Sequence, residues 1–153
     1  MISKRIEDEC MEEIDELLKK DCYIIDFLPF QVSTGSSGQY FKIEKYYLNH
    51  YEEYGFKEKF INILLKIMCY YQVSIYWNEW ANKPTPEQFV KIVNGYLKTR
   101  TSVISVVIPE KEALIQFEWD NLNMQVFNPD EELSKLLKQV SLSEGLFWRK
   151  AEQ

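Results

Sequence analysis

The sequence predicts an α+β fold, a single domain over residues 1–153 with helices packed on a mixed sheet of about five strands. Three observations indicate this class. Over residues 59–66 the polar side chains recur only at i, i+3 and i+7, which is typical of a helix buried around most of its circumference. Apolar and polar residues then alternate over residues 73–78, the period of a strand with one buried face. A similar alternation flanks residues 120–121 and predicts a hairpin.

The chain begins with a predicted acidic amphipathic helix over residues 3–20. Its apolar residues recur at helical spacing, at Ile6, Cys10, Ile14, Leu17 and Leu18. A short strand over residues 22–28 should follow, and Asp26 interrupts its apolar run. If this strand is central, Asp26 needs a partner, because burial of a lone carboxylate is costly; an edge position or a solvated face would remove that need.

The middle of the chain is expected to place the helix of residues 60–71 before a central strand. A helix over residues 38–49 precedes it, because Ser36 and Gln39 match a capping box; a strand remains the alternative for this segment. Residues 78–84 are expected to form a loop.

A threonine cap and a proline at the first helical position start the next predicted helix, over residues 86–98. The β-branched residues 102–108 then predict a strand. Residues 72–108 could form a right-handed βαβ unit, whereas residues 102–128 require an antiparallel meander.

The hairpin is predicted to turn at Asp120-Asn121. Its cross-strand pairs on the core face would be Trp119 with Leu122, Phe117 with Met124, and Ile115 with Val126. The last predicted helix starts at residues 128–132 with a cap, a proline and acids in the first turn, and it ends at Gly145. Residues 146–148 add a short strand.

Composition excludes several classes of function. The net charge is -6, and residues 1–21 carry eight acids against four bases. Nucleic acid is therefore a poor partner, because acidic segments repel phosphate. The three cysteines are widely spaced, so we expect free thiols, no metal site and no cofactor. The sequence shows neither a signal peptide nor a membrane-length apolar run, which predicts a cytoplasmic protein.

Catalytic chemistry finds little support in the sequence. Nucleotide-binding and nucleophile-elbow motifs are absent, and no serine or cysteine motif surrounds the sole histidine, His50, which is expected to be an ordinary surface residue. Glu118 and Asp120 near the hairpin tip, or Asp26, could act as general acid and base or hold a divalent cation. A solvated strand face at a turn also explains them.

Residues 40–56 have the most unusual composition, because seven of their seventeen residues are aromatic. Tyrosine gives a large contact area at low entropic cost and tolerates water. We hypothesise that this segment, with the preceding STGSSG loop of residues 33–38, forms a partner surface; the alternative is that several of its rings cover the core. The predicted binding residues are Tyr40, Phe41, Tyr46, Tyr47, Tyr51, Tyr54, Glu118 and Asp120.

Residues 23–48 (YIIDFLPFQVSTGSSGQYFKIEKYYL), the NPDEEL helix start and the SEGLFW ending resemble a family of small, uncharacterised bacterial proteins. The resemblance implies a bacterial cytoplasmic origin and one domain. It implies no activity and no site residues.

The leading hypothesis is a non-enzymatic intracellular domain that binds another protein through aromatic and acidic surfaces. A sharper version is an immunity-type inhibitor whose acidic segments meet a basic toxin. The rival is a small hydrolase or ligand-binding domain with a carboxylate in a pocket. A homodimer through the tyrosine-rich segment is the third possibility.

Overall fold

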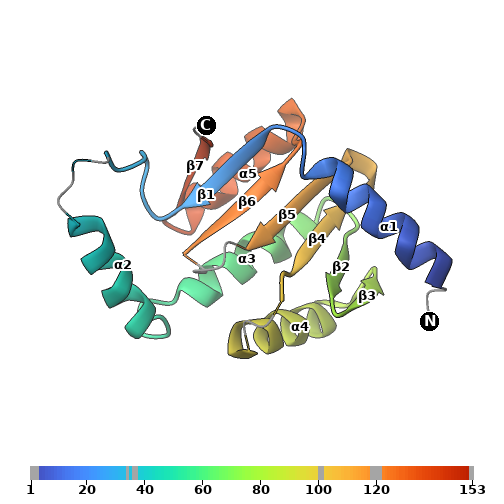
Figure 1. The fold of residues 1–153 in the computed structure, drawn as a ribbon, viewed down its shortest axis with the longest axis horizontal. Coiled ribbons are helices and arrows are strands. Elements are labelled where there is room, and N and C mark those ends of the chain that lie inside the picture. The colour runs from blue at the N-terminus through green and yellow to red at the C-terminus, as the bar shows by residue number, and fades with distance from the viewer. Residues whose placement is uncertain (1–3, 34, 36–37, 100–101, 118–121, 152–153) are drawn as a thin grey trace.

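The sheet is antiparallel at each pairing that the structure describes. The computed structural model describes residues 4–33, 35, 38–99, 102–117 and 122–151. Seven strands are seen there: β1 (Cys22–Asp26), β2 (Ser74–Trp77), β3 (Glu79–Asn82), β4 (Ser105–Ile108), β5 (Ala113–Phe117), β6 (Asn123–Phe127) and β7 (Phe147–Lys150). Their order is β3-β2-β4-β5-β6-β1-β7 (Figure 1). The α+β class is confirmed, but the predicted mixed sheet of about five strands is wrong in both strand count and direction.

The segment expected to be a loop supplies strand β3. Asn78 has a φ of 66°, a left-handed conformation that asparagine tolerates in tight hairpin turns, and Tyr76 then pairs with Trp80. Because β3 carries the chain back to the start of β2, α4 (Pro86–Thr99) must run along the sheet to the other end of β2. Strand β4 returns from there antiparallel to β2, so the predicted βαβ unit is wrong. For the same reason β2 lies next to the sheet edge, not at its centre.

The helices cover the two sheet faces unequally. The helices α3 (Phe56–Met68) and α5 (Glu131–Ser143) pack on one face together with α4, and α1 (Lys4–Leu17) crosses the other (Figure 1). The large core on the first face includes Phe60, Ile63, Leu64, Leu133 and Leu137 from the helices. The smaller core is built from Ile14, Leu17, Val107, Leu114 and Phe127.

The meander and its hairpin register are confirmed where the structure describes them. Strands β4, β5 and β6 are consecutive neighbours, and Phe117 pairs with Met124 as Ile115 does with Val126. These four side chains and Leu122 are buried in the large core. Trp119, Glu118 and the Asp120-Asn121 turn lie outside the described residues.

The final strand of the chain lies beside its first strand. Gly145 adopts a φ of 76° after α5, and the strand that follows pairs with β1. Strand β1 is therefore an inner strand, and Asp26 is almost fully buried. Its predicted partner exists, because the Arg149 Nη2 atom lies 3.0 Å from the Asp26 Oδ2 atom.

Candidate functional site

The helix α2 (Gln39–Asn49) stands at one end of the molecule, beyond the side of the sheet on which β1 ends and β6 begins (Figure 1). Its N-cap is Gly38, at a φ of 77°, and glycine has no side chain with which to cap the first turn. The helix expected over residues 38–49 is confirmed over its strand alternative, but its N-cap is a left-handed glycine and not Ser36, which lies outside the described residues. None of the eleven residues of α2 is buried. A helix of this length without a buried residue is held by few contacts of its own.

One flank of α2 attaches it to the rest of the chain. The Tyr47 ring lies edge-on to Phe27 at 5.4 Å and to Phe56 at 5.0 Å, and the Tyr40 ring stacks on Phe27 at 6.3 Å. Tyr51, which follows the helix, is buried and stacks on Phe56 at 5.6 Å. Tyr40, Tyr47 and Tyr51 thus pack within the molecule, as the core-roofing alternative expected for some of the rings.

The other sequence-predicted rings of this segment remain in solvent. Phe41 is 68% exposed, Tyr46 46% and Tyr54 43%, and Ile43 beside them is 51% exposed. We call these four residues the α2 surface. From their helical positions, Phe41 lies on one side of the outer face and Tyr46 on the other, with the exposed Lys42 and Lys45 between them.

Tyr46 and Tyr54 form a connected pair at one side of the α2 surface. Their hydroxyl oxygens are 3.0 Å apart and their ring centroids 5.8 Å apart. The hydrogen bond to Tyr46 raises the pKa of Tyr54, because it stabilises the protonated hydroxyl. Tyr54 therefore stays uncharged at neutral pH and presents a ring and a hydroxyl, which is the chemistry of a protein contact.

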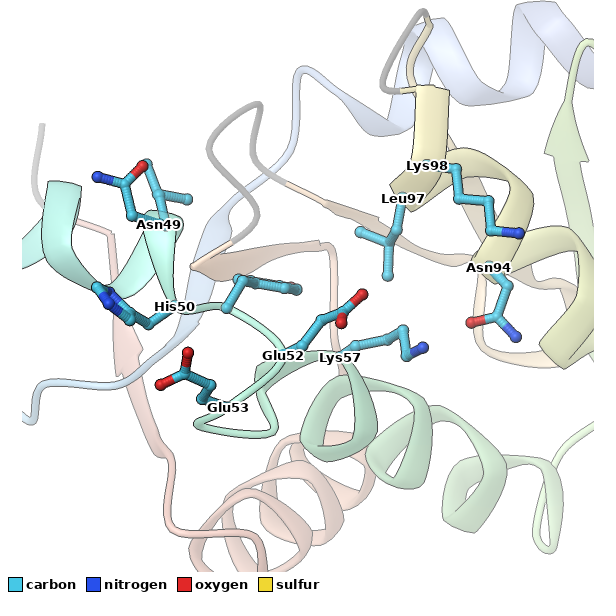
Figure 2. A pocket seen from close by; sticks show the side chains of 10 residues that line it. Asn49, His50, Glu52, Glu53, Lys57, Asn94, Leu97 and Lys98 are labelled. Carbon is cyan, nitrogen blue, oxygen red and sulfur yellow. The ribbon is translucent and has the colours of Figure 1, made fainter.

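A cleft of about 600 Å³ opens beside the C-terminal end of α2 (Figure 2). The turn that contains His50 and Tyr51 forms one wall, Lys57 of α3 lies at its base, and Asn94, Leu97 and Lys98 of α4 form the opposite wall. The lining carries two acids, Glu52 and Glu53, and two lysines, so its charges balance apart from His50. The Asn94 Oδ1 atom is buried and has no hydrogen-bond partner among the described residues.

The cleft offers no evident catalytic set. The ten residues that line it include neither serine nor cysteine. The His50 ring stacks on Tyr46 at 4.2 Å, and its Nδ1 atom lies 2.8 Å from the Tyr46 carbonyl oxygen, so it supports the end of α2. Across the described ranges, no group of three or more His, Cys, Asp or Glu side chains could hold a metal ion.

The carboxylates considered from the sequence have different outcomes. Glu118 and Asp120 belong to the part of the chain left undescribed, so their proposed role stays a prediction. Asp26 lines a second, smaller cavity with Tyr40, Asn123 and Arg149. Sequence reasoning singled out Asp26 and Tyr40 but neither of their neighbours, because β6 and β7 approach β1 only in the folded sheet.

Comparisons with known proteins return no match: no family model, curated protein or solved structure matches the chain. The resemblance to a family of small bacterial proteins stays a prediction. Within the described residues, no helix has both the length and the apolar character to cross a membrane.

Proposed function

We propose that this protein is a non-enzymatic protein-binding domain whose contact surface is the α2 surface. The observation that carries the proposal is that α2 buries none of its own residues while it holds Phe41, Ile43 and Tyr46 in solvent. Scattered exposed apolar residues are ordinary, but several on one projecting helix resemble the aromatic anchors of protein interfaces. The helix needs only its inner flank for attachment, which leaves its outer face available.

The cleft beside the α2 surface strengthens this proposal. In protein interfaces, the anchor side chains of one protein fit into pockets on the other. The exposed rings of the α2 surface could serve as anchors, and the cleft beside them could receive an anchor of the partner. Because its lysines and acids balance, the cleft suits an uncharged side chain better than an ion. The buried, unpartnered Asn94 Oδ1 atom at its wall would accept a hydrogen bond from such a side chain.

We further propose a basic partner, of which a toxin bound by an immunity-type inhibitor is the sharper form. Six acids in α1 are exposed, namely Asp8, Glu9, Glu12, Glu13, Asp15 and Glu16. Helices α1 and α2 lie at opposite ends of the molecule (Figure 1), so the acids and the rings do not form one patch. The acids would attract a basic protein through their long-range field, while the rings, with Lys42 and Lys45 between them, would contact a part of that protein that is not itself basic.

The test compares two variants that are matched in exposure. The first carries Phe41→Ser with Tyr46→Ser on the α2 surface; the control carries Tyr70→Ser with Leu142→Ser, which are 65% and 52% exposed elsewhere. Tagged full-length wild type and both variants are used to capture partners from the native cells. Each captured protein is then purified and titrated against all three chains at low and high salt.

The proposal requires that one purified basic partner binds the wild type and the control, and that the α2 variant binds it at least ten-fold more weakly. High salt should slow its association, since the steering field is screened. Equal binding by both variants, or no partner for the wild type, would refute the α2 surface as the contact. If the sedimentation of the wild type and the control depends on concentration and that of the α2 variant does not, the partner is a second copy of this chain. That result would contradict the proposal of a basic partner.

A further inference from the structure

A polar corner lies on the sheet face that carries α1, at the end of β1 and the start of β6, away from Cys22 and Phe127 where these two strands contact the helix. Asp26 on β1 pairs in register with Asn123 on β6, and Ile24 on β1 pairs with Arg149 on β7, so the four side chains share one face. Their strand neighbours point to the opposite face and pack beneath α3 and α5. On the polar face, α1 packs over β4, β5 and the far end of β6, so it does not fill this corner.

The corner is hollow. A cavity of about 360 Å³ has Asp26, Asn123 and Arg149 on its sheet side. Its remaining lining is largely apolar or aromatic and includes Leu28, Phe30, Val32 and Tyr40, contributed by the segment after β1 and the first turn of α2. Phe30 is 79% exposed and stands at this site without a core role. The size falls in the range of small-molecule sites.

The charges in the cavity neutralise each other. The Asp26 side chain is 6% exposed and pairs with Arg149, and its Oδ1 atom accepts the Phe27 backbone N–H at 2.8 Å. An anionic ligand would face a guanidinium that already has its carboxylate, and a cationic ligand would meet a carboxylate whose two oxygens are engaged. The electrostatics therefore favour an uncharged ligand.

Two buried polar atoms of residues that line this cavity lack partners among the described residues. They are the Asn123 Oδ1 atom, an acceptor, and the Arg149 Nε atom, whose N–H is a donor. Buried polar groups are nearly always paired in folded proteins, and those left unpaired in a cavity mark the positions that a ligand's polar atoms would take. A complementary ligand carries an N–H donor and a carbonyl acceptor on one molecule, as a lactam does.

We propose that this cavity binds an uncharged planar heterocycle through a lactam edge. The ligand carbonyl would accept from the Arg149 N–H, its own N–H would donate to Asn123, and its ring would lie against Tyr40 and Phe30. None of the four residues of the α2 surface lines this cavity, although the Phe41 ring lies edge-on to Tyr40 at 5.6 Å, and the inference does not depend on the proposed protein partner.

The experiment titrates the full chain with three pyrimidines and follows backbone amide signals by NMR. Uracil carries the lactam edge, 1,3-dimethyluracil lacks both N–H groups, and orotate adds a carboxylate to the same ring. Uracil should shift the signals of Ile24, Asn123 and Arg149, and the other two compounds should bind at least about ten-fold more weakly. No uracil shift at millimolar concentration, or equal binding of 1,3-dimethyluracil, would overturn the proposal.

A pair of neighbouring variants separates a ligand role from a structural one. Asn123→Leu removes the unpartnered acceptor, so its unfolding stability should match or exceed that of the wild type while uracil affinity falls about ten-fold. Gln125→Leu, two residues along the same strand and outside the cavity lining, should keep that affinity. Full uracil affinity in Asn123→Leu would contradict the proposal, as would a large loss of stability. A chain with Tyr46→Ser alone, which keeps the Phe41 ring against Tyr40, should bind uracil normally, whatever becomes of its protein partner.

Discussion

One phenylalanine of the aromatic segment is buried and another is exposed. Replacing each by alanine tests whether one part of this segment attaches it to the core while another part remains in solvent. Phe56 is 3% exposed, and its ring lies within 5.0 Å of Tyr47, 5.6 Å of Tyr51 and 6.2 Å of Phe27. Phe56→Ala should lower the free energy of unfolding by about 3–5 kcal/mol, because it removes a buried ring and leaves a cavity. The melting temperature should fall by roughly 10 °C for a chain of this size.

Phe41→Ala removes a ring that is 68% exposed, so little packing is lost. The change should stay within about 0.5 kcal/mol, since surface substitutions rarely exceed this and alanine favours the helix slightly. Urea unfolding followed by tryptophan fluorescence measures both variants, with the Tyr70→Ser, Leu142→Ser chain as a surface control. A loss above about 1 kcal/mol in Phe41→Ala would show that this ring is packed and would remove the physical basis of the α2 surface. A loss below about 1 kcal/mol in Phe56→Ala would show that the anchor was misassigned.

Three further changes test other parts of the fold. Asp130→Ala removes the side chain that caps α5 and should cost about 1 kcal/mol at neutral pH. The hydrogen bond from the capped backbone N–H lowers the pKa of Asp130. The stability that the cap contributes is therefore fully present above the ordinary aspartate pKa and is lost as the pH falls through the lowered value. Urea unfolding at several pH values measures this loss. Arg149→Leu leaves Asp26 buried without its partner and should cost about 3–5 kcal/mol at neutral pH. Burial raises the pKa of Asp26 despite Arg149, so protonated Asp26 favours the folded state at low pH, and this contribution is lost as the pH rises. The stability that Arg149→Leu loses relative to the wild type should therefore become smaller in acid. A loss of stability that does not change with pH would contradict this account. Gly95→Ala would place a Cβ atom 2.9 Å from the Trp77 ring. This clash should outweigh the gain in helix propensity of about 1 kcal/mol, so the variant should be less stable and its tryptophan emission should shift. A variant more stable than the wild type would refute the close packing of Gly95 against Trp77.

The part of the candidate site that sequence could predict is its composition. The excess of rings over residues 40–56 was visible directly, and Phe41, Tyr46 and Tyr54 are exposed as a partner surface requires. The sequence could not show that Tyr51 packs inward, because tyrosine suits both a core and a wet surface. Nor could it show the cleft against α4 or the partner of Asp26, since these join segments far apart in the chain.

Local periodicity determined the helices and the hairpin. The period-2 pattern and the turn residues placed Ile115 opposite Val126, because a shift of one residue would turn every apolar side chain of the strand to the other face. The positions of α1, α3, α4 and α5 followed from their apolar stripes and start signals to within a few residues at each end, whereas α2 was expected from a capping box at Ser36 and its N-cap is Gly38 instead.

Tertiary structure alone decided the strand order, the antiparallel return of β4 and the pairing of Asp26 with Arg149, 123 residues apart. The physical reason is that a side-chain period shows which side of an element is apolar, but it does not show which element covers that side. That choice depends on the packing of the whole chain, and it also leaves the outer face of α2 and the polar corner of the sheet uncovered.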